Sequence, residues 1–287
     1  MTSNPIFPED IERTIIEVLL ADARDMRCTI ASLSSRFYAW TKPIIFRTIV
    51  VRRHNDWTKR ISDLLLPNAG LIHTLAIDLK GQLSNDELSH VHALLTAADQ
   101  IRHLAVGWPI WIQLSRECGA LRLESLYLMW DRTHKVPAPS LTHLQHPAAL
   151  KDLTVYAPPN IQNPTPFRPW GEFYLPDTAR CVNLAYVAYA ADRTPIPTVG
   201  SLCEDIPNLR AAMFVLVDIS EQYAGEDALV TEDKALYPNF STTYLRFSQQ
   251  VLGEWLAKVE GRRSVLEYPP PRIVETLELD SAPVVEN

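Results

Sequence analysis

Apolar residues recur at helical spacing near the start of the chain. Over residues 7–20 they cover an arc of about 200° on a helical wheel, interrupted by Glu12. Pro8 suits a first helical turn. A helix that packs on one core needs about half of this width, so we expect either that the chain covers both flanks or that another protein covers one. The arc comprises Ile11, Ile15, Ile16, Val18, Leu19 and Leu20.

A second amphipathic segment follows after a short connector. Asp25 is a favourable helix N-cap, and apolar residues then recur at spacings of four, three, four and three. Because a proline disfavours helical geometry in the residue before it, Pro43 predicts that this helix ends near Thr41. A short turn over 44–46 would lead into a strand over 48–51. The helical face comprises Met26, Ile30, Leu33, Phe37 and Trp40.

Residues 6–47 resemble the F-box, in the form common among fungal F-box proteins. Phe7-Pro8-Glu9-Asp10-Ile11 stands where that family has Leu-Pro-x-Glu-Leu, and Ser34-Ser35-Arg36 stands where it has Val-Cys/Ser-Arg. The resemblance implies binding to the Skp adaptor of a cullin–RING ubiquitin ligase. Carried over by position, the adaptor-facing residues would be Pro8, Ile11, Ile15, Leu33, Arg36, Phe37, Pro43 and Ile44. The alternative is that this unit is only a helical cap on the domain that follows.

A six-residue pattern, apolar-x-x-Leu-x-apolar, recurs through the rest of the chain. Successive copies from 46 to 209 begin 22 to 31 residues apart, close to the ~20–29 residues of leucine-rich repeats. Helix candidates lie between copies, including a capping box at Ser84–Glu87 and an amphipathic stretch over 243–260. The alternative is an ordinary α/β domain whose strands share this pattern. The copies begin at Phe46, Ile72, Ile101, Leu123, Leu150, Cys181 and Leu209, with a further one at Val274.

These patterns predict an α/β chain in which a short three-helix F-box-like unit caps an irregular leucine-rich-repeat-like β/α solenoid. We expect tails at 1–5 and 281–287, the helical unit at 6–47 and the solenoid at 48–280. Phe46 belongs both to the helical unit and to the first repeat, so the unit is continuous with the solenoid. Terminal repeats need such caps because they cannot otherwise bury their outer faces.

Alternate side chains of a strand point to opposite faces, so the third, fifth and seventh positions of each copy should line an open concave face. On this face Tyr127, Met129 and Tyr156 are the expected apolar anchors for a protein substrate, and His103 and Asp152 are the expected polar contacts. We expect replacement of both tyrosines by alanine to abolish substrate capture with little loss of stability. The alternative is a solvated strand face.

Composition narrows the function classes. With 287 residues, 47% hydrophobic and 21% charged, the chain has a globular composition. The net charge of −7, without a Lys/Arg-rich run, argues against nucleic acid as a partner. No apolar run approaches the ~18 residues of a membrane span, and no secretory signal is visible, so we expect a cytoplasmic or nuclear protein. Cys28, Cys118, Cys181 and Cys203 are far apart, which predicts neither a disulfide framework nor a zinc site.

Catalytic signatures are missing from the sequence. There is no Gly-x-Ser-x-Gly elbow and no glycine-rich phosphate loop. We therefore expect no catalytic residue, no metal and no cofactor. The F-box resemblance implies a substrate-receptor subunit of a Skp–cullin–F-box type ubiquitin ligase, which bridges the Skp adaptor and an unknown protein substrate. The alternative is a repeat-based interaction scaffold without a ubiquitin link; an unassigned hydrolase comes third.

Overall fold

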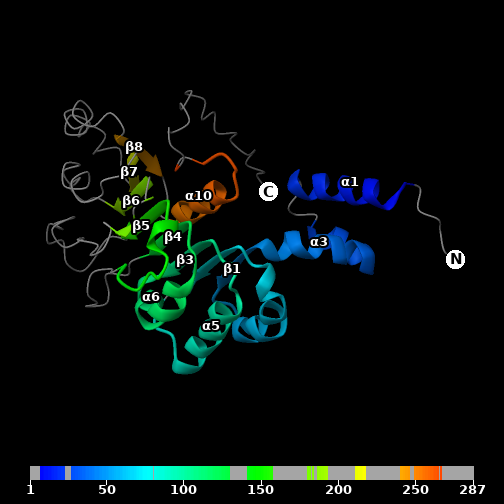
Figure 1. The fold of residues 1–287 in the computed structure, drawn as a ribbon, viewed down its shortest axis with the longest axis horizontal. Helices are drawn as coiled ribbons and strands as arrows, with labels where there is room; N and C mark the ends of the chain where they lie inside the picture. The colour runs from blue at the N-terminus through cyan, green and yellow to red at the C-terminus, as the bar shows by residue number, and fades with distance from the viewer. Residues whose placement is uncertain are drawn as a thin grey trace, which may run out of the picture.

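Three helices open the part of the chain that the structure describes. This computed structural model describes residues 7–22, 27–79, 81–129, 141–157, 180–181, 183, 186–192, 211–217, 240–245, 249–264 and 266. The helices are α1 (Glu9–Asp22), α2 (Arg27–Leu33) and α3 (Ser35–Arg47). α1 and α3 lie side by side and project away from the rest of the molecule (Figure 1).

The second predicted helix is divided in two, and its predicted end is wrong. Ser34 has an extended backbone, and its hydroxyl accepts a hydrogen bond from the Phe37 N–H, so it caps a new helix. α3 then continues through Pro43 to Arg47. Pro43 lies on the exposed side of the helix. Because proline has no backbone N–H, one carbonyl of the preceding turn lacks its helical donor, and water can donate to it there. On the other side, Phe46 anchors the last turn in the main core.

The described residues after α3 include a parallel sheet, so the predicted mixed α/β class is confirmed. Among these described residues, eight strands follow one another in chain order across the sheet. Each of the first five strands coincides with a predicted six-residue copy, and the central leucines Leu75, Leu104, Leu126 and Leu153 pair side by side. The strands are β1 (Thr48–Arg52), β2 (Thr74–Asp78), β3 (His103–Gly107), β4 (Ser125–Met129), β5 (Asp152–Ala157), β6 (Tyr186–Asp192), β7 (Ala211–Val217) and β8 (Phe240–Leu245).

The copy predicted at Cys181 is out of register by three residues. Val187 pairs with Leu153, so the matching copy begins at residue 184. The next copy is correct, because Ala212, its fourth position, pairs with Val187. The copy at Val274 and the two predicted tails lie outside the described residues.

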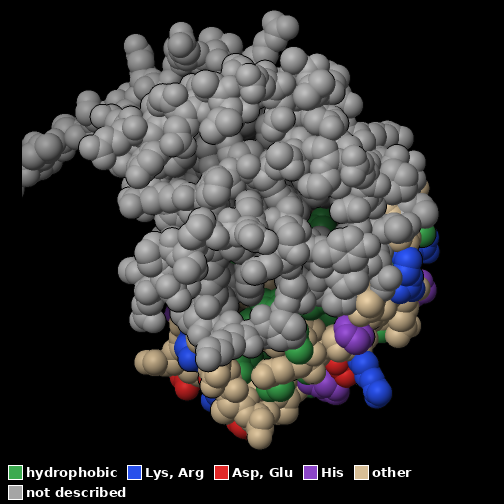
Figure 2. All heavy atoms as spheres, turned by 90° about the vertical axis from the view of Figure 1, so that its left-hand side faces the viewer, with side chains coloured by type: hydrophobic (Ala, Val, Ile, Leu, Met, Phe, Trp, Pro, Cys, Tyr) green, Lys and Arg blue, Asp and Glu red, His purple; other side chains and the backbone are tan. Residues whose placement is uncertain are grey.

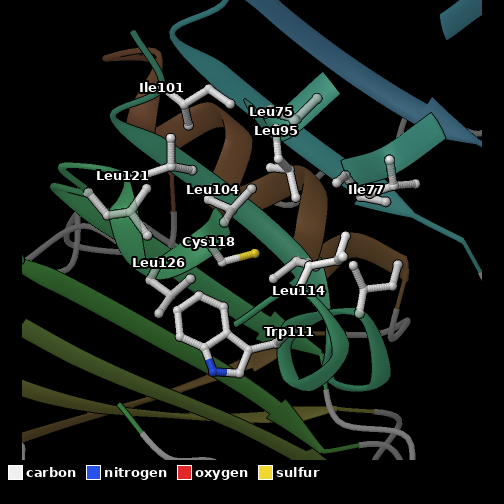
Figure 3. Packing of buried hydrophobic residues seen from close by; sticks show 14 of the residues in the cluster. Leu75, Ile77, Leu95, Ile101, Leu104, Trp111, Leu114, Cys118, Leu121 and Leu126 are labelled. Carbon is white, nitrogen blue, oxygen red and sulfur yellow. The ribbon is translucent and has the colours of Figure 1, made fainter. Parts of the chain in front are cut away.

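Helices cover one face of β1–β5 and bury the main core between themselves and the sheet. Leucines and isoleucines from the strands meet Leu95, Trp111 and Cys118 from these helices (Figure 3). The predicted capping box is present, with reciprocal bonds between Ser84 and Glu87. The helices on this face are α4 (Trp57–Arg60), η2 (Ile61–Leu65), η3 (Leu66–Leu71), α5 (Asn85–Ala97), α6 (Trp108–Gln113), α7 (Ser115–Ala120) and η4 (Pro147–Ala149).

One helix, α10 (Gln249–Val259), lies on the opposite face of the sheet (Figure 1). It forms a second cluster with side chains from β2–β5 that point away from the main core. In this region the sheet is therefore covered on both faces.

None of the described helices combines the length and the apolar character that a membrane crossing requires.

Candidate functional site

The apolar arc of α1 is divided between the chain's own core and solvent. Ile16 and Leu20 are buried with Ile30 of α2, and Phe37, Trp40 and Ile44 of α3 pack against them. The adjoining part of the arc is exposed: Ile11 and Ile15 are each 44% exposed and Val18 is 58% exposed. The exposed residues, called here the N-terminal stripe, are Phe7, Ile11, Ile15, Val18 and Leu19.

Six of the eight predicted adaptor-facing residues have exposed side chains. Phe37 and Ile44 are half-buried against the small core of the unit. Leu33, at the end of α2, is 66% exposed. The exposed members of the predicted set are Pro8, Ile11, Ile15, Leu33, Arg36 and Pro43. The adaptor role of these residues stays a prediction, but their surface is open to a partner.

Arg36 links α1 to α3 beside the N-terminal stripe. Its guanidinium forms an ion pair with Glu12 of α1. It also lies 4.9 Å from the ring centroid of Trp40 and 5.8 Å from that of Phe37, within the range of a cation–π interaction. Arg36 therefore contacts both α1 and α3 where the two helices pack together.

The face expected to receive a substrate is covered by α10, so the expectation of an open surface is wrong there. Tyr127 and Tyr156 are only 3% and 6% exposed, and both pack in one cluster with Trp255 of α10. The expectation that both tyrosines could be replaced without loss of stability is not compatible with this burial. Their role in substrate binding stays a prediction, and it requires that α10 leave the face.

All five predicted substrate-binding residues lie on this same face of the sheet. Tyr127 and Tyr156 are central, and Met129 is half-buried at the edge of their cluster. His103 and Asp152 begin β3 and β5, in a row of paired residues that also contains Ser125. The alternation of strand side chains thus groups these residues as predicted, and only their covering was missed.

Two polar contacts attach α10 to this face. The indole Nε1–H of Trp255 donates to the Ser125 hydroxyl at 3.0 Å, and the Trp255 ring lies 5.8 Å from that of Tyr127. Three residues further on, the Lys258 ammonium forms an ion pair with Oδ2 of Asp152. Both side chains of this pair are less than one fifth exposed. The small side chains of Ala76 and Ala105 join the same cluster.

Several buried polar atoms on this face have no hydrogen-bond partner among the described residues. They are Nδ1 of His103, Oδ1 of Asp152 and the hydroxyl of Thr154. Burial raises the pKa of the Asp152 carboxyl, although the Lys258 ammonium acts to lower it. Burial also lowers the pKa of His103, which favours the neutral imidazole at pH 7. The face therefore has polar binding capacity that α10 does not use.

Sequence reasoning missed the place of α10, although its amphipathic pattern was visible. Pattern alone shows that a helix has an apolar face, but not which face of a sheet it covers. The predicted helix over 243–260 is shorter in the structure, because Leu245 belongs to β8.

No catalytic arrangement stands out in the part of the chain that is described. Burial raises the pKa of the Cys118 thiol to about 12, so it is not a reactive thiolate. No group of three or more potential metal ligands is found among the described residues. On the described surface visible in Figure 2, histidine, basic and acidic side chains are interspersed.

Comparisons with known proteins assign no family. No protein-family model matches the chain, and no curated protein matches it. The residue pattern and the geometry above are therefore what point to a function.

Proposed function

We propose that the chain is a substrate-receptor subunit of a Skp–cullin–F-box type ubiquitin ligase. In this role the N-terminal stripe and the adjoining ends of α2 and α3 dock on the Skp adaptor. The sheet domain holds a target protein. Catalysis would occur by proximity, because a target held near an activated ubiquitin has a high effective concentration.

The observation that carries this proposal is the exposure of the N-terminal stripe. Soluble proteins seldom leave a contiguous apolar patch open without a partner. α1 buries Ile16 and Leu20 internally, yet leaves Ile11, Ile15 and Val18 in solvent. Of these three exposed residues, Ile11 and Ile15 are among those that the F-box resemblance assigns to the adaptor.

The connection between the two regions supports the same proposal. α3 ends at Arg47 and β1 begins at Thr48, so no linker separates them. Phe46 is buried in the main core, and Ile45 and Ile49 pack against it. Such a rigid connection would hold a target at a fixed place relative to the adaptor. We further propose that the chain-order parallel strands form a leucine-rich-repeat-like solenoid.

Co-expression with the Skp adaptor tests this function. We expect the two proteins to co-purify, and we expect Ile11→Asp to abolish co-purification because it places a charge inside the apolar interface. Leu64→Asp is the matched control, since Leu64 is similarly exposed, at 48%, but lies in η2. A folded wild-type chain that does not co-purify with the adaptor, or an equal effect of both substitutions, would overturn the proposal.

A second candidate, an interaction scaffold with the helical unit as a mere cap, is favoured by one observation. The burial of Phe46 in the main core is what a capping role requires. A cap alone does not explain why the adjoining part of the apolar arc of α1 remains exposed. Normal adaptor binding would exclude this candidate, and its absence from a correctly folded chain would favour it.

A further inference from the structure

The sheet face under α10 has the features of a binding site for a helix. The residues that α10 places on the sheet are Val251, Trp255 and Lys258, at spacings of four and three that put them on one helical face. Ala76 and Ala105 leave room beside Tyr127 for the large Trp255 side chain, which is fully buried. An apolar surface that seats a tryptophan from an amphipathic helix is a common mode of peptide recognition.

α10 does not fully satisfy this site. Lys258 engages Oδ2 of Asp152, whereas Oδ1 is buried without a hydrogen-bond partner. An ammonium is a compact point charge, but a guanidinium presents two parallel N–H donors that match both oxygens of a carboxylate. An arginine at the position of Lys258 would therefore be a better partner for Asp152 than the lysine is.

α10 also contains a residue that lowers its stability as a helix. Gly253 lies in its interior, where glycine is destabilising relative to alanine. The residue is exposed, and a Cβ at this position would meet no atom within 4 Å. The packing therefore does not require a glycine, and α10 is less stable as a helix than it would be with alanine at this position.

We propose that the face under α10 is the target-binding site and that its ligand is an amphipathic helix of another protein. This ligand helix carries an apolar residue, then a tryptophan four residues later, then an arginine three residues after that. α10 is a resident helix that occupies the site until such a ligand replaces it. That the bound protein is a ubiquitination target rests on the proposed function. The binding of the helix itself does not require the adaptor.

The test uses the full chain and two fluorescently labelled peptides. One peptide has the sequence of residues 249–259, and the other carries Lys258→Arg. Fluorescence anisotropy measures the binding of each peptide to the wild-type chain and to the Gly253→Ala, Trp255→Ala and Asp152→Asn chains. Because these measurements contain no adaptor, a negative result here is distinct from a failure of adaptor co-purification.

We expect the arginine peptide to bind the wild-type chain roughly tenfold more tightly than the lysine peptide, as suits a bidentate charge-assisted pair. Asp152→Asn should remove this preference. Gly253→Ala strengthens the resident helix, so it should weaken peptide binding about two- to fivefold, whereas Trp255→Ala should strengthen it. Equal affinity of both peptides, no response to Gly253→Ala, or no saturable binding would overturn the proposal. If Trp255→Ala does not fold, the two peptides and the Gly253→Ala and Asp152→Asn chains still decide.

Discussion

α1 and α10 are both amphipathic helices, but the two differ in how far their apolar faces are buried. Val251 and Trp255 of α10 are fully buried against the sheet, whereas Ile11, Ile15 and Val18 of α1 remain in solvent. α10 also has a hydrogen bond and an ion pair to the sheet. The contact of α1 with α3 includes one partly exposed ion pair, between Arg36 and Glu12.

The difference separates two roles that a sequence pattern alone does not distinguish. A helix whose apolar face is covered by its own chain contributes to the stability of the fold. A helix whose apolar face is left open contributes little stability and offers area to a partner. Substitutions on the two helices should therefore have very different effects on the free energy of unfolding.

The largest expected effect is from Trp255→Ala. Removing a fully buried tryptophan costs about 3–5 kcal/mol in cavity and transfer terms. Val18→Ala on α1 is the matched control, and we expect a change of less than about 0.5 kcal/mol because the side chain is exposed. Urea unfolding followed by circular dichroism measures both. Similar losses for the two variants would contradict the contrast between the helices.

The next effect is from Lys258→Met, which leaves the Asp152 carboxylate buried without its cation. We expect a loss of about 3 kcal/mol at pH 7, the low end for a broken buried pair, because both side chains are slightly exposed. Urea unfolding of the variant and the wild type at pH 7 measures this loss.

The loss should depend on pH. Burial already raises the pKa of folded Asp152, and Lys258 acts to lower it, so the substitution raises it further. The folded variant then keeps its proton to a higher pH than the unfolded chain does, and stability falls as pH rises from about 4 toward the folded pKa. The double variant Lys258→Met with Asp152→Asn should lack this dependence. A loss that is equal at pH 4 and pH 7 would show that the charge of Asp152 is not its cause.

A smaller effect is expected from Trp255→Phe. The ring still fills the site beside Tyr127, but the Ser125 hydroxyl loses the donor at 3.0 Å. We expect a loss of about 1 kcal/mol beyond the change in side-chain volume. A double-mutant cycle with Ser125→Ala isolates the hydrogen bond, and a coupling energy near zero would mean that this bond does not help to hold α10.

The smallest effect on stability is expected from Val18→Ser and Leu33→Ser. Both side chains are more than half exposed, so the free energy of unfolding should change by less than about 0.5 kcal/mol. Adaptor binding should nevertheless weaken, since the apolar contact is lost. A marked loss of stability would show that the chain itself covers these residues.

The strands were more predictable than the arrangement around them. In β2–β5 a leucine at the fourth position of each copy must be buried, which fixes both the strand and its register. In β6 the sequence around Val187 offers several small or aromatic residues, so more than one register fits the pattern. The structure selects the register in which Val187 pairs with Leu153.

The candidate site was predictable as a set of residues but not as a covered surface. Strand alternation groups Tyr127, Asp152 and Tyr156 on one face, because it depends only on local geometry. The packing of α10 on that face depends on contacts such as Trp255 with Ser125, which are 130 positions apart. No local pattern carries that information. The break at Ser34 was missed because a capping serine interrupted an apolar stripe that continued across it.

Hydrogen–deuterium exchange of the full chain, with and without the Skp adaptor, tests the central claim most directly. The N-terminal stripe is proposed to be the docking surface for that adaptor. We predict that amides of α1 and of the first half of α3 gain protection when the adaptor is added, while those of α10 and the sheet do not change. Unchanged exchange in α1 at saturating adaptor, or protection confined to the sheet, would contradict the claim.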